Sequence, residues 1–304
     1  MKGSSSGAAL GVAMRKPRRD FTGLVYIAPW VIGFAAFKVF PLLTSLYLSL
    51  TSYNIVSPPI FVGLRNFAQA FLGDSLFWQS AKVSGAYVLL TAPVRLVVAL
   101  FVAYLLSSRV RGIAFFRAIY YIPSLMGGSV AIAILWRVVF QETGLINQVL
   151  AALHLPTPVW FAGSFSALFV ISSLHVWQFG ATMVIFLAAL KNIPVSLIEA
   201  AVIDGARRRQ IFMRVTIPYI TPVIFFNLII NLVNAFQEFN TPYVVTQGGP
   251  KHATYLMSLM IYNNAFTYLK MGYSSALSWI LFTAIAAITI ILFKSSNAWV
   301  HYQE

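Results

Sequence analysis

Residues 199–218 read EAAVIDGARRRQIFMRVTIP and separate two strongly hydrophobic stretches of the chain. The part from Glu199 to Ala206 is rich in helix-forming residues, and Gly205 permits a sharp reversal of the backbone. Arg207 to Val215 has the pattern of a second short amphipathic helix before the stop at Pro218. The sequence therefore predicts a helix, a turn and a helix in the connection between two apolar segments.

The composition is typical of a protein that crosses a membrane several times. Of the 304 residues, 59% are hydrophobic and 9% are charged, whereas a soluble domain carries roughly 25% charged residues. A transmembrane helix needs about 20 consecutive, mostly apolar residues. Stretches of this kind cover residues 24–48, 83–106, 115–140, 165–190, 219–245 and 275–293. The predicted fold is all-α, a polytopic membrane protein with six transmembrane helices.

The positions of the basic residues predict the orientation. Fourteen of the 21 Lys and Arg residues lie in the N-terminal segment, in the second-to-third and fourth-to-fifth connections, and after the sixth span. Basic residues gather on the cytoplasmic side of multi-pass proteins, so both termini and residues 199–218 are expected in the cytoplasm. Basic helix ends that face anionic lipid headgroups explain the net charge of +14, and no nucleic-acid partner is expected.

The two ends of the chain and its cysteine content limit other interpretations. Residues 1–20 are expected to be a basic cytoplasmic tail, and residues 21–304 a single transmembrane domain. The first apolar stretch is too long for the core of a cleaved signal peptide, and no small-residue cleavage site follows it, so a retained span is predicted. The chain has no cysteine, which excludes disulfides, thiolate metal sites and a cysteine nucleophile.

The segment 199–218 resembles the EAA loop in the permease subunits of ATP-driven, binding-protein-dependent importers (ABC importers). In that pattern three residues separate Glu-Ala-Ala from a glycine. Nine further residues then lead to an Ile, which is followed by any one residue and by Leu-Pro. Here three residues separate Ala201 from Gly205, while Val215 and Ile217 replace the Ile and Leu before Pro218. Positive-inside bias alone would explain the arginines but not this spacing. The resemblance implies these ATPase-coupling residues: Glu199, Ala200, Ala201, Asp204, Gly205, Ala206 and Arg207.

The resemblance extends over nearly the whole chain to carbohydrate-class members of this family, such as permeases for maltose, glycerol phosphate and lactose. It rests on Ala28-Pro29, residues 45–51 (SLYLSLT), 61–64 (FVGL) and 246–250 (TQGGP), and on Arg111-Gly112. It implies the type I ABC importer permease fold, with the coupling loop at about 196–218, in a bacterial inner membrane. It also implies a homologous second permease, two ATPase subunits that bind ATP and Mg, an extracytoplasmic solute-binding protein and a sugar substrate. No cofactor is expected in this chain.

The fifth apolar stretch carries polar residues at helical spacing. They follow one another at intervals of four, three, four and three, which places them on one face of a helix. These residues are Asn227, Asn231, Asn234, Glu238 and Thr241. Polar side chains inside a membrane normally face a cavity or another helix. The stripe is therefore predicted either to line a solute pathway or to join neighbouring helices through its amides.

The fourth apolar stretch has a second set at helical spacing, formed by His175, Gln178, Phe179 and Thr182. The resemblance implies that these four residues contact the sugar together with Phe236, Gln237, Glu238 and Asn240. Aromatic rings stack on sugar faces, and amide and imidazole groups bond to hydroxyls. For His175, a place in the protein core remains an alternative. Arg95, in the second stretch, is expected to pair with Glu238, with a backbone carbonyl or with the companion permease.

Enzymatic motifs are missing from the sequence. The four histidines have no metal-binding spacing, no phosphate-binding G-x-x-x-x-G-K-[ST] loop is present, and the seven acidic residues form no evident acid–base pair. A transport subunit rather than an enzyme is therefore predicted. Two alternatives are an ABC permease for an amino acid, peptide or phosphate ester, and an ion-coupled secondary transporter that would use Glu238 as its coupling carboxylate.

Overall fold

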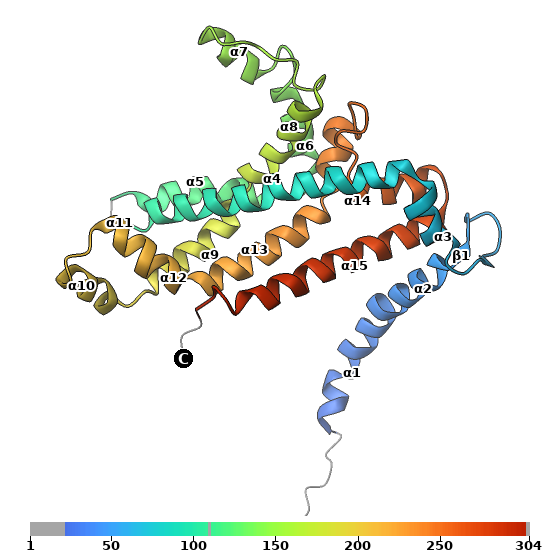
Figure 1. Cartoon of the computed structure of the whole chain (residues 1–304), viewed down its shortest axis with the longest axis horizontal. Coiled ribbons are helices and arrows are strands. Elements are labelled where there is room, and N and C mark those ends of the chain that lie inside the picture. Colours follow the sequence, from blue (N-terminus) through green and yellow to red (C-terminus); the bar gives the residue numbers. More distant parts are fainter. Residues whose placement is uncertain (1–21, 109–110, 302–304) are drawn as a thin grey trace, which may run out of the picture. The chain divides into compact units, whose positions relative to one another are not determined.

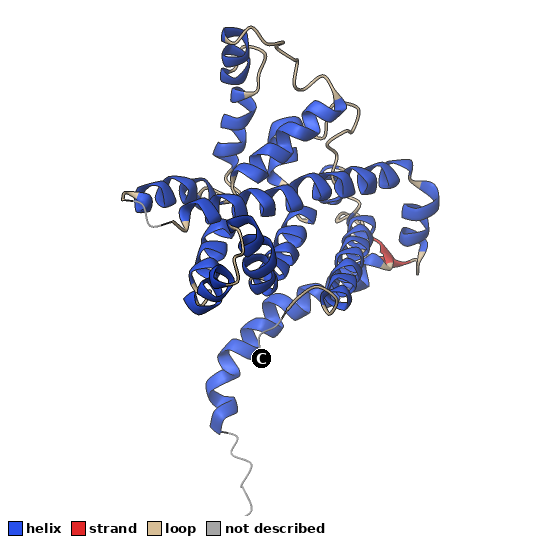
Figure 2. Ribbon diagram, turned by 60° about the vertical axis from the view of Figure 1, so that its left-hand side comes forward, coloured by secondary structure: helices blue, strands red, loops and turns tan. Residues whose placement is uncertain are grey.

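The computed structural model describes residues 22–108 and 111–301, and the tail expected at residues 1–20 lies outside them. The described chain is mostly helical, with one pair of two-residue strands (Figure 2). It divides into two compact units, residues 1–47 and 48–304. The expected all-α fold is confirmed for the described residues.

The first unit is a long apolar helix with one irregular turn. α1 (Thr22–Phe34) continues through the π-helical turn η1 (Ala35–Val39) into α2 (Phe40–Ser49), whose last residues belong to the second unit. Tyr26–Ser49 contains a window with a mean hydropathy of 1.7, which is enough for a membrane span.

Two long helices in the second unit are also apolar enough to cross a membrane without interruption. They are α4 (Ser75–Leu106) and α15 (Met271–Ser296). α4 begins well before the expected start at residue 83, because Asp74 caps it: Oδ1 of Asp74 accepts a hydrogen bond from the backbone N–H of Leu76 at 2.9 Å.

The other three expected spans are bent pairs of helices rather than single continuous helices. α5 (Ile113–Leu125) meets α6 (Val130–Val139) at 104°, and α8 (Ser164–Trp177) meets α9 (Gly180–Lys191) at 45°. The run of α11 (Arg208–Ile211), η3 (Phe212–Thr216) and α12 (Ile217–Tyr219) meets α13 (Thr221–Phe236) at 66°. With each bent pair taken as one span, the described residues contain up to six candidate spans.

Backbone chemistry explains the interruptions. Gly128, between α5 and α6, has a φ of +72°, a conformation that glycine adopts without steric cost. Pro222 lies in the first turn of α13, where its missing N–H is tolerated but prevents continuation of the preceding helix. α13 ends at Phe236 rather than near the expected residue 245, and helical structure resumes only beyond Phe239, leading into η4 (Pro242–Thr246).

Short elements complete the second unit. β1 (Thr51–Ser52) pairs antiparallel with β2 (Ile60–Phe61), with Thr51 opposite Phe61. The remaining elements are α3 (Arg65–Ala68), η2 (Gln69–Gly73), α7 (Leu145–Ala152), α10 (Val195–Ile203), α14 (Met257–Tyr262) and η5 (Asn263–Thr267). Within this unit α4, α13 and α15 run side by side, with α10 and α11 near one end and α3 and β1 near the other (Figure 1).

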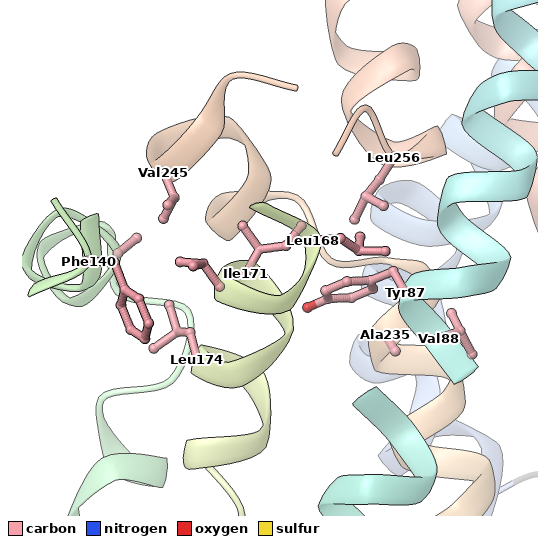
Figure 3. Close-up of a cluster of buried hydrophobic side chains, with 11 residues drawn as sticks. Tyr87, Val88, Phe140, Leu168, Ile171, Leu174, Ala235, Val245 and Leu256 are labelled. Carbon is pink, nitrogen blue, oxygen red and sulfur yellow. The ribbon is translucent and has the colours of Figure 1, made fainter. Parts of the chain in front are cut away.

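The main buried cluster joins α4, α8 and α13. Tyr87 of α4 extends toward Leu168 and Ile171 of α8, and Ala235 of α13 lies below it (Figure 3). A second close contact joins α9 to α5: a Cβ on Gly180 would lie 2.4 Å from the carbonyl oxygen of Tyr120. Only glycine allows this approach, which fixes the bend between α8 and α9 against α5.

Candidate functional site

Arg95 connects α4 with the bend between α8 and α9. Its Nη2 donates to the backbone oxygen of Gln178 at 2.7 Å, and its Nη1 lies 3.0 Å from Nε2 of His175. Because a guanidinium group only donates hydrogen bonds, Nε2 must accept, and the ring proton of a neutral imidazole is then on Nδ1. A backbone carbonyl is one of the three partners expected for Arg95, and the hydrogen bond to Gln178 is a contact of this kind.

His175 lies between Arg95 and Glu238. The distance from Nδ1 of His175 to Oε2 of Glu238 is 3.7 Å, which is longer than a direct hydrogen bond. Oε1 of Glu238 accepts from the backbone N–H of Thr241 at 2.9 Å and from its hydroxyl at 2.8 Å. The carboxylate thus caps the helical segment that follows α13. A cation and an anion lie on opposite sides of the imidazole ring.

Asn240, two residues after Glu238, contacts the bend between α5 and α6. Its Nδ2 donates to the backbone oxygen of Gly128 at 2.9 Å. A Cβ on Gly127, which precedes Gly128, would lie 3.6 Å from Oε1 of Gln178, so the bend between α8 and α9 lies close to the bend between α5 and α6. Three helix interruptions therefore meet at one group of side chains. We call this group the polar junction: Arg95, His175, Gln178, Glu238 and Asn240.

Two buried polar atoms, one in the polar junction and one beside it, have no hydrogen-bond partner among the described residues. Tyr87 is fully buried, its ring meets that of His175 edge-on with centroids 6.2 Å apart, and its hydroxyl makes no hydrogen bond to the described residues. The same is true of Nε of Arg95. Buried polar groups are normally hydrogen-bonded. These atoms thus mark a place where water or a hydroxyl-bearing ligand would be stabilised.

Two of the eight expected sugar contacts take part in helix packing. Phe179 belongs to an apolar cluster with Ala99 and Met183, and its ring lies 5.9 Å from that of Tyr120. The hydroxyl of Thr182 is buried and accepts a hydrogen bond from Asn231 at 3.3 Å. The expected single stripe of four residues is interrupted, because α8 ends at Trp177 and the bend intervenes.

The side chains of Phe236 and Gln237 contact residues outside the polar junction. Phe236 is half-buried and packs against the main cluster. Gln237 is exposed and lines a groove of about 500 Å³ between α13 and α15, whose other walls are mostly apolar. The structure thus brings His175, Gln178, Glu238 and Asn240 together, whereas the contacts of the remaining four predicted residues are with other neighbours.

The polar stripe predicted for the fifth span is only partly one surface. Nδ2 of Asn227 donates to the carbonyl oxygen of Val223 at 2.9 Å, within the same helix. Asn231 bonds both to the carbonyl oxygen of Asn227 and to Thr182, so its amide joins α13 to α9. The expectation that Glu238 and Thr241 continue this helical face is wrong, because α13 ends at Phe236.

The segment with the EAA pattern forms an exposed helix and a tight turn. α10 contains Glu199, and the N–H groups of Gly205 and Ala206 donate to the carbonyl oxygens of Val202 and Ala201, both at 3.0 Å. This pair of bonds is a Schellman motif, which requires a left-handed residue just beyond the helix. Gly205 has a φ of +76°, and nothing lies within 4 Å of a Cβ placed on it.

The remaining residues predicted for coupling lie on or after this helix. Ala201 and Ala206 are half-buried, and the exposed ones are Glu199, Ala200, Asp204, Gly205 and Arg207. The backbone N–H of Arg207 donates to Oε1 of Gln210 at 2.7 Å, which starts α11. Large apolar side chains of α10 are also exposed, including Ile203 with 85% of its surface. Such exposure is typical of a surface that another protein covers.

Sequence reasoning missed Tyr87 and the Gly127-Gly128 pair. Tyr87 and Arg95 are eight residues apart on one helix, a spacing that places both near one face. Adjacent glycines soon after Pro123, inside an apolar stretch, also indicate a break in a membrane helix. Neither signal identifies the partners across the bends.

Comparisons with known proteins agree with this architecture. Residues 95–304 match the family model described as "Binding-protein-dependent transport system inner membrane component". The chain is 44% identical over 305 residues to the probable ABC transporter permease protein YesP of Bacillus subtilis, covering 99% of each chain. It is 31% identical over 275 residues to the probable starch degradation products transport system permease protein AmyD of Thermoanaerobacterium thermosulfurigenes, covering 88% of this chain and 91% of that one.

A solved structure has a similar fold. It is a chain in the crystal structure of a bacterial ABC transporter involved in the import of the acidic polysaccharide alginate. The TM-score is 0.76 with 21% sequence identity, over 92% of this chain and 96% of that chain.

Proposed function

Because this chain belongs to the family of binding-protein-dependent transport system inner membrane components, we propose that it forms half of the pathway by which a sugar or oligosaccharide enters the cell. It is a multi-pass membrane permease of an ABC importer and not an enzyme. A homologous permease would form the other half of the pathway. Two ATPase subunits would bind ATP and Mg and drive alternating access, and a solute-binding protein would deliver the sugar. Both termini would be cytoplasmic.

The polar junction is the observation that carries the proposed sugar site. Interrupted helices inside a membrane are tolerated where they are enclosed by protein or line a water-filled cavity. Here the interruptions bring amides, an imidazole and an unpaired tyrosine hydroxyl into one region. These groups both donate and accept hydrogen bonds, as sugar hydroxyls require. We therefore propose Gln178, Asn240, His175 and Glu238 as the sugar-facing group, with Tyr87 added.

The charges of the polar junction favour a neutral sugar. The cation of Arg95 and the anion of Glu238 flank His175, so each offsets the other. An acidic sugar would add a second carboxylate beside Glu238, and the single positive charge of Arg95 could balance only one of the two in a region of low dielectric. Saccharides related to starch degradation products, which AmyD is named for, fit this balance. If no carboxylate offset the charge of Arg95, the site would instead favour a negatively charged solute such as a phosphate ester.

Gln178→Ala tests the sugar site. The substitution removes the side-chain amide but keeps the backbone oxygen that binds Arg95, so the bend should remain. Loss of one hydrogen bond to a buried ligand costs about 0.5 to 1.5 kcal/mol, and sugar uptake at limiting concentration should fall about twofold to tenfold. Uptake and ATPase activity stimulated by the solute-binding protein would be measured together in proteoliposomes that contain the complete importer.

Asn227→Ala is the matched control for this experiment. Its side chain is buried, and its amide bonds to a carbonyl of its own helix. Its uptake should change less than that of Gln178→Ala. Unchanged uptake in Gln178→Ala would refute a role for the polar junction in binding the sugar.

We further propose that α10 and the turn at Gly205 dock on the ATPase. The exposed apolar side chains of α10 and its defined C-terminal cap support this proposal, because a docking helix needs a free surface and a fixed end. Glu199→Lys reverses the charge of an exposed residue on this helix. It should weaken attachment of the ATPase while leaving the permease in the membrane. Full uptake with normal ATPase recovery would contradict the proposed docking.

A further inference from the structure

A small polar pocket lies at the end of the second unit that carries β1 and the start of α15, away from α10 and α11 (Figure 1). Its volume is about 250 Å³, and its walls come from residues 52–54, Asn66, Gln69, Lys270 and Tyr273. We call this pocket the outer socket. Two neighbouring segments, 52–54 and 66–69, meet Lys270 and Tyr273 from the distant start of α15 here.

The walls of the outer socket are rigidly held. Nδ2 of Asn66 donates to the carbonyl oxygens of Ser49 at 2.8 Å and Thr51 at 2.9 Å. The N–H of Gly272 donates to the oxygen of Tyr53 at 3.1 Å, and a Cβ on Gly272 would lie only 2.0 Å from the oxygen of Thr51. The strand is therefore packed directly against the start of α15. A pocket that exists before binding loses little entropy when a ligand enters it.

The electrostatics of the outer socket favour an anion. Lys270 is exposed at its wall and has no carboxylate partner among the described residues. It immediately precedes α15, whose amino-terminal end adds a partial positive charge. The nearby carboxylate of Asp74 is already engaged, because Oδ1 accepts from Leu76 at 2.9 Å and Oδ2 accepts from the hydroxyl of Tyr273 at 2.7 Å. The positive charge of Lys270 is therefore available to a partner.

We propose that the outer socket receives an acidic side chain from the solute-binding protein, with Lys270 as its ionic partner. This inference rests on the proposed function, which places the connections at this end of the unit outside the cell. The volume has room for a carboxylate side chain together with water molecules. Further exposed cations on these connections, Arg65 and Lys251, favour an acidic partner surface.

Charge reversal tests the proposal. In nanodiscs containing the complete importer, Lys270→Glu should raise the concentration of solute-binding protein that half-maximally stimulates the ATPase by about tenfold or more, the loss expected for a charge-assisted hydrogen bond. Lys82→Glu reverses a lysine outside the outer socket and should change this concentration less than about twofold. Substituting one carboxylate of the binding protein with lysine should restore stimulation of the Lys270→Glu importer.

Three outcomes would overturn the proposal. A half-stimulating concentration for Lys270→Glu equal to that of Lys82→Glu would show that the outer socket is not a contact. An effect of Lys270→Glu in anionic phosphatidylglycerol but not in zwitterionic phosphatidylcholine would assign the outer socket to an anionic lipid headgroup. Failure of every single carboxylate substitution in the binding protein to restore stimulation would also refute an acidic side chain as the occupant. If the unsubstituted importer showed neither stimulation nor uptake, the proposed function itself would fail.

Discussion

The conformation of Gly205 gives the sharpest prediction about coupling. Gly205 has a φ of +76° and completes the Schellman motif of α10, while nothing lies within 4 Å of the position of a Cβ. A side chain at this position therefore meets a backbone penalty and no steric clash. The left-handed conformation costs an L-residue roughly 1 to 2 kcal/mol, which would reduce the capped population of α10 by a factor of about 5 to 30.

The size of the defect should follow the backbone preference of the new residue. Asparagine tolerates the left-handed region better than alanine, and β-branched valine tolerates it least. We therefore expect ATP-driven uptake in proteoliposomes to decrease in the order Gly205→Asn, Gly205→Ala, Gly205→Val. Hydrolysis by the ATPase should become less dependent on the solute-binding protein in the same order.

Gly63→Ala provides a control with the same backbone cost at another place. Gly63 has a φ of +61° and also has nothing within 4 Å of the position that a Cβ would occupy, but it lies in the connection before α3. The Gly63→Ala substitution should therefore reduce uptake less than the Gly205→Ala substitution does. Equal uptake by all three Gly205 variants and by Gly63→Ala would refute the reasoning, since the cap would then have no part in coupling.

Two other predictions concern the polar junction and the topology. Arg95→Met should lower the stability of the purified complex by about 3 kcal/mol, measured by thermal unfolding, because it leaves Glu238 as an uncompensated charge, and adding Glu238→Gln should recover part of the loss. A double variant that is less stable than Arg95→Met would contradict this charge balance. Because the chain contains no cysteine, Arg208→Cys should resist an impermeant thiol reagent added outside intact cells, whereas His252→Cys should react. The opposite labelling pattern would reverse the predicted orientation.

The sequence was sufficient for the features that depend on local composition and spacing. Apolar stretches of the required length predict the candidate spans, and the segment from Glu199 to Pro218 predicts a helix, a turn and a second helix. The positive φ of Gly205 confirms the predicted reversal. Hydropathy and glycine preference are properties of the residues themselves, so they can be recognised without knowledge of distant contacts.

Only the tertiary structure decided where the spans bend and which polar residues meet. The backbone oxygen of Gln178 binds Arg95, which is 83 positions away, and that of Gly128 binds Asn240, which is 112 positions away. Hydropathy predicts continuous helices because it records the composition of a stretch and not the partners of its backbone groups. In a membrane, a carbonyl that leaves the helical pattern must find another donor. Donors contributed by other helices therefore determine which interruptions are stable, and they bring the polar junction together.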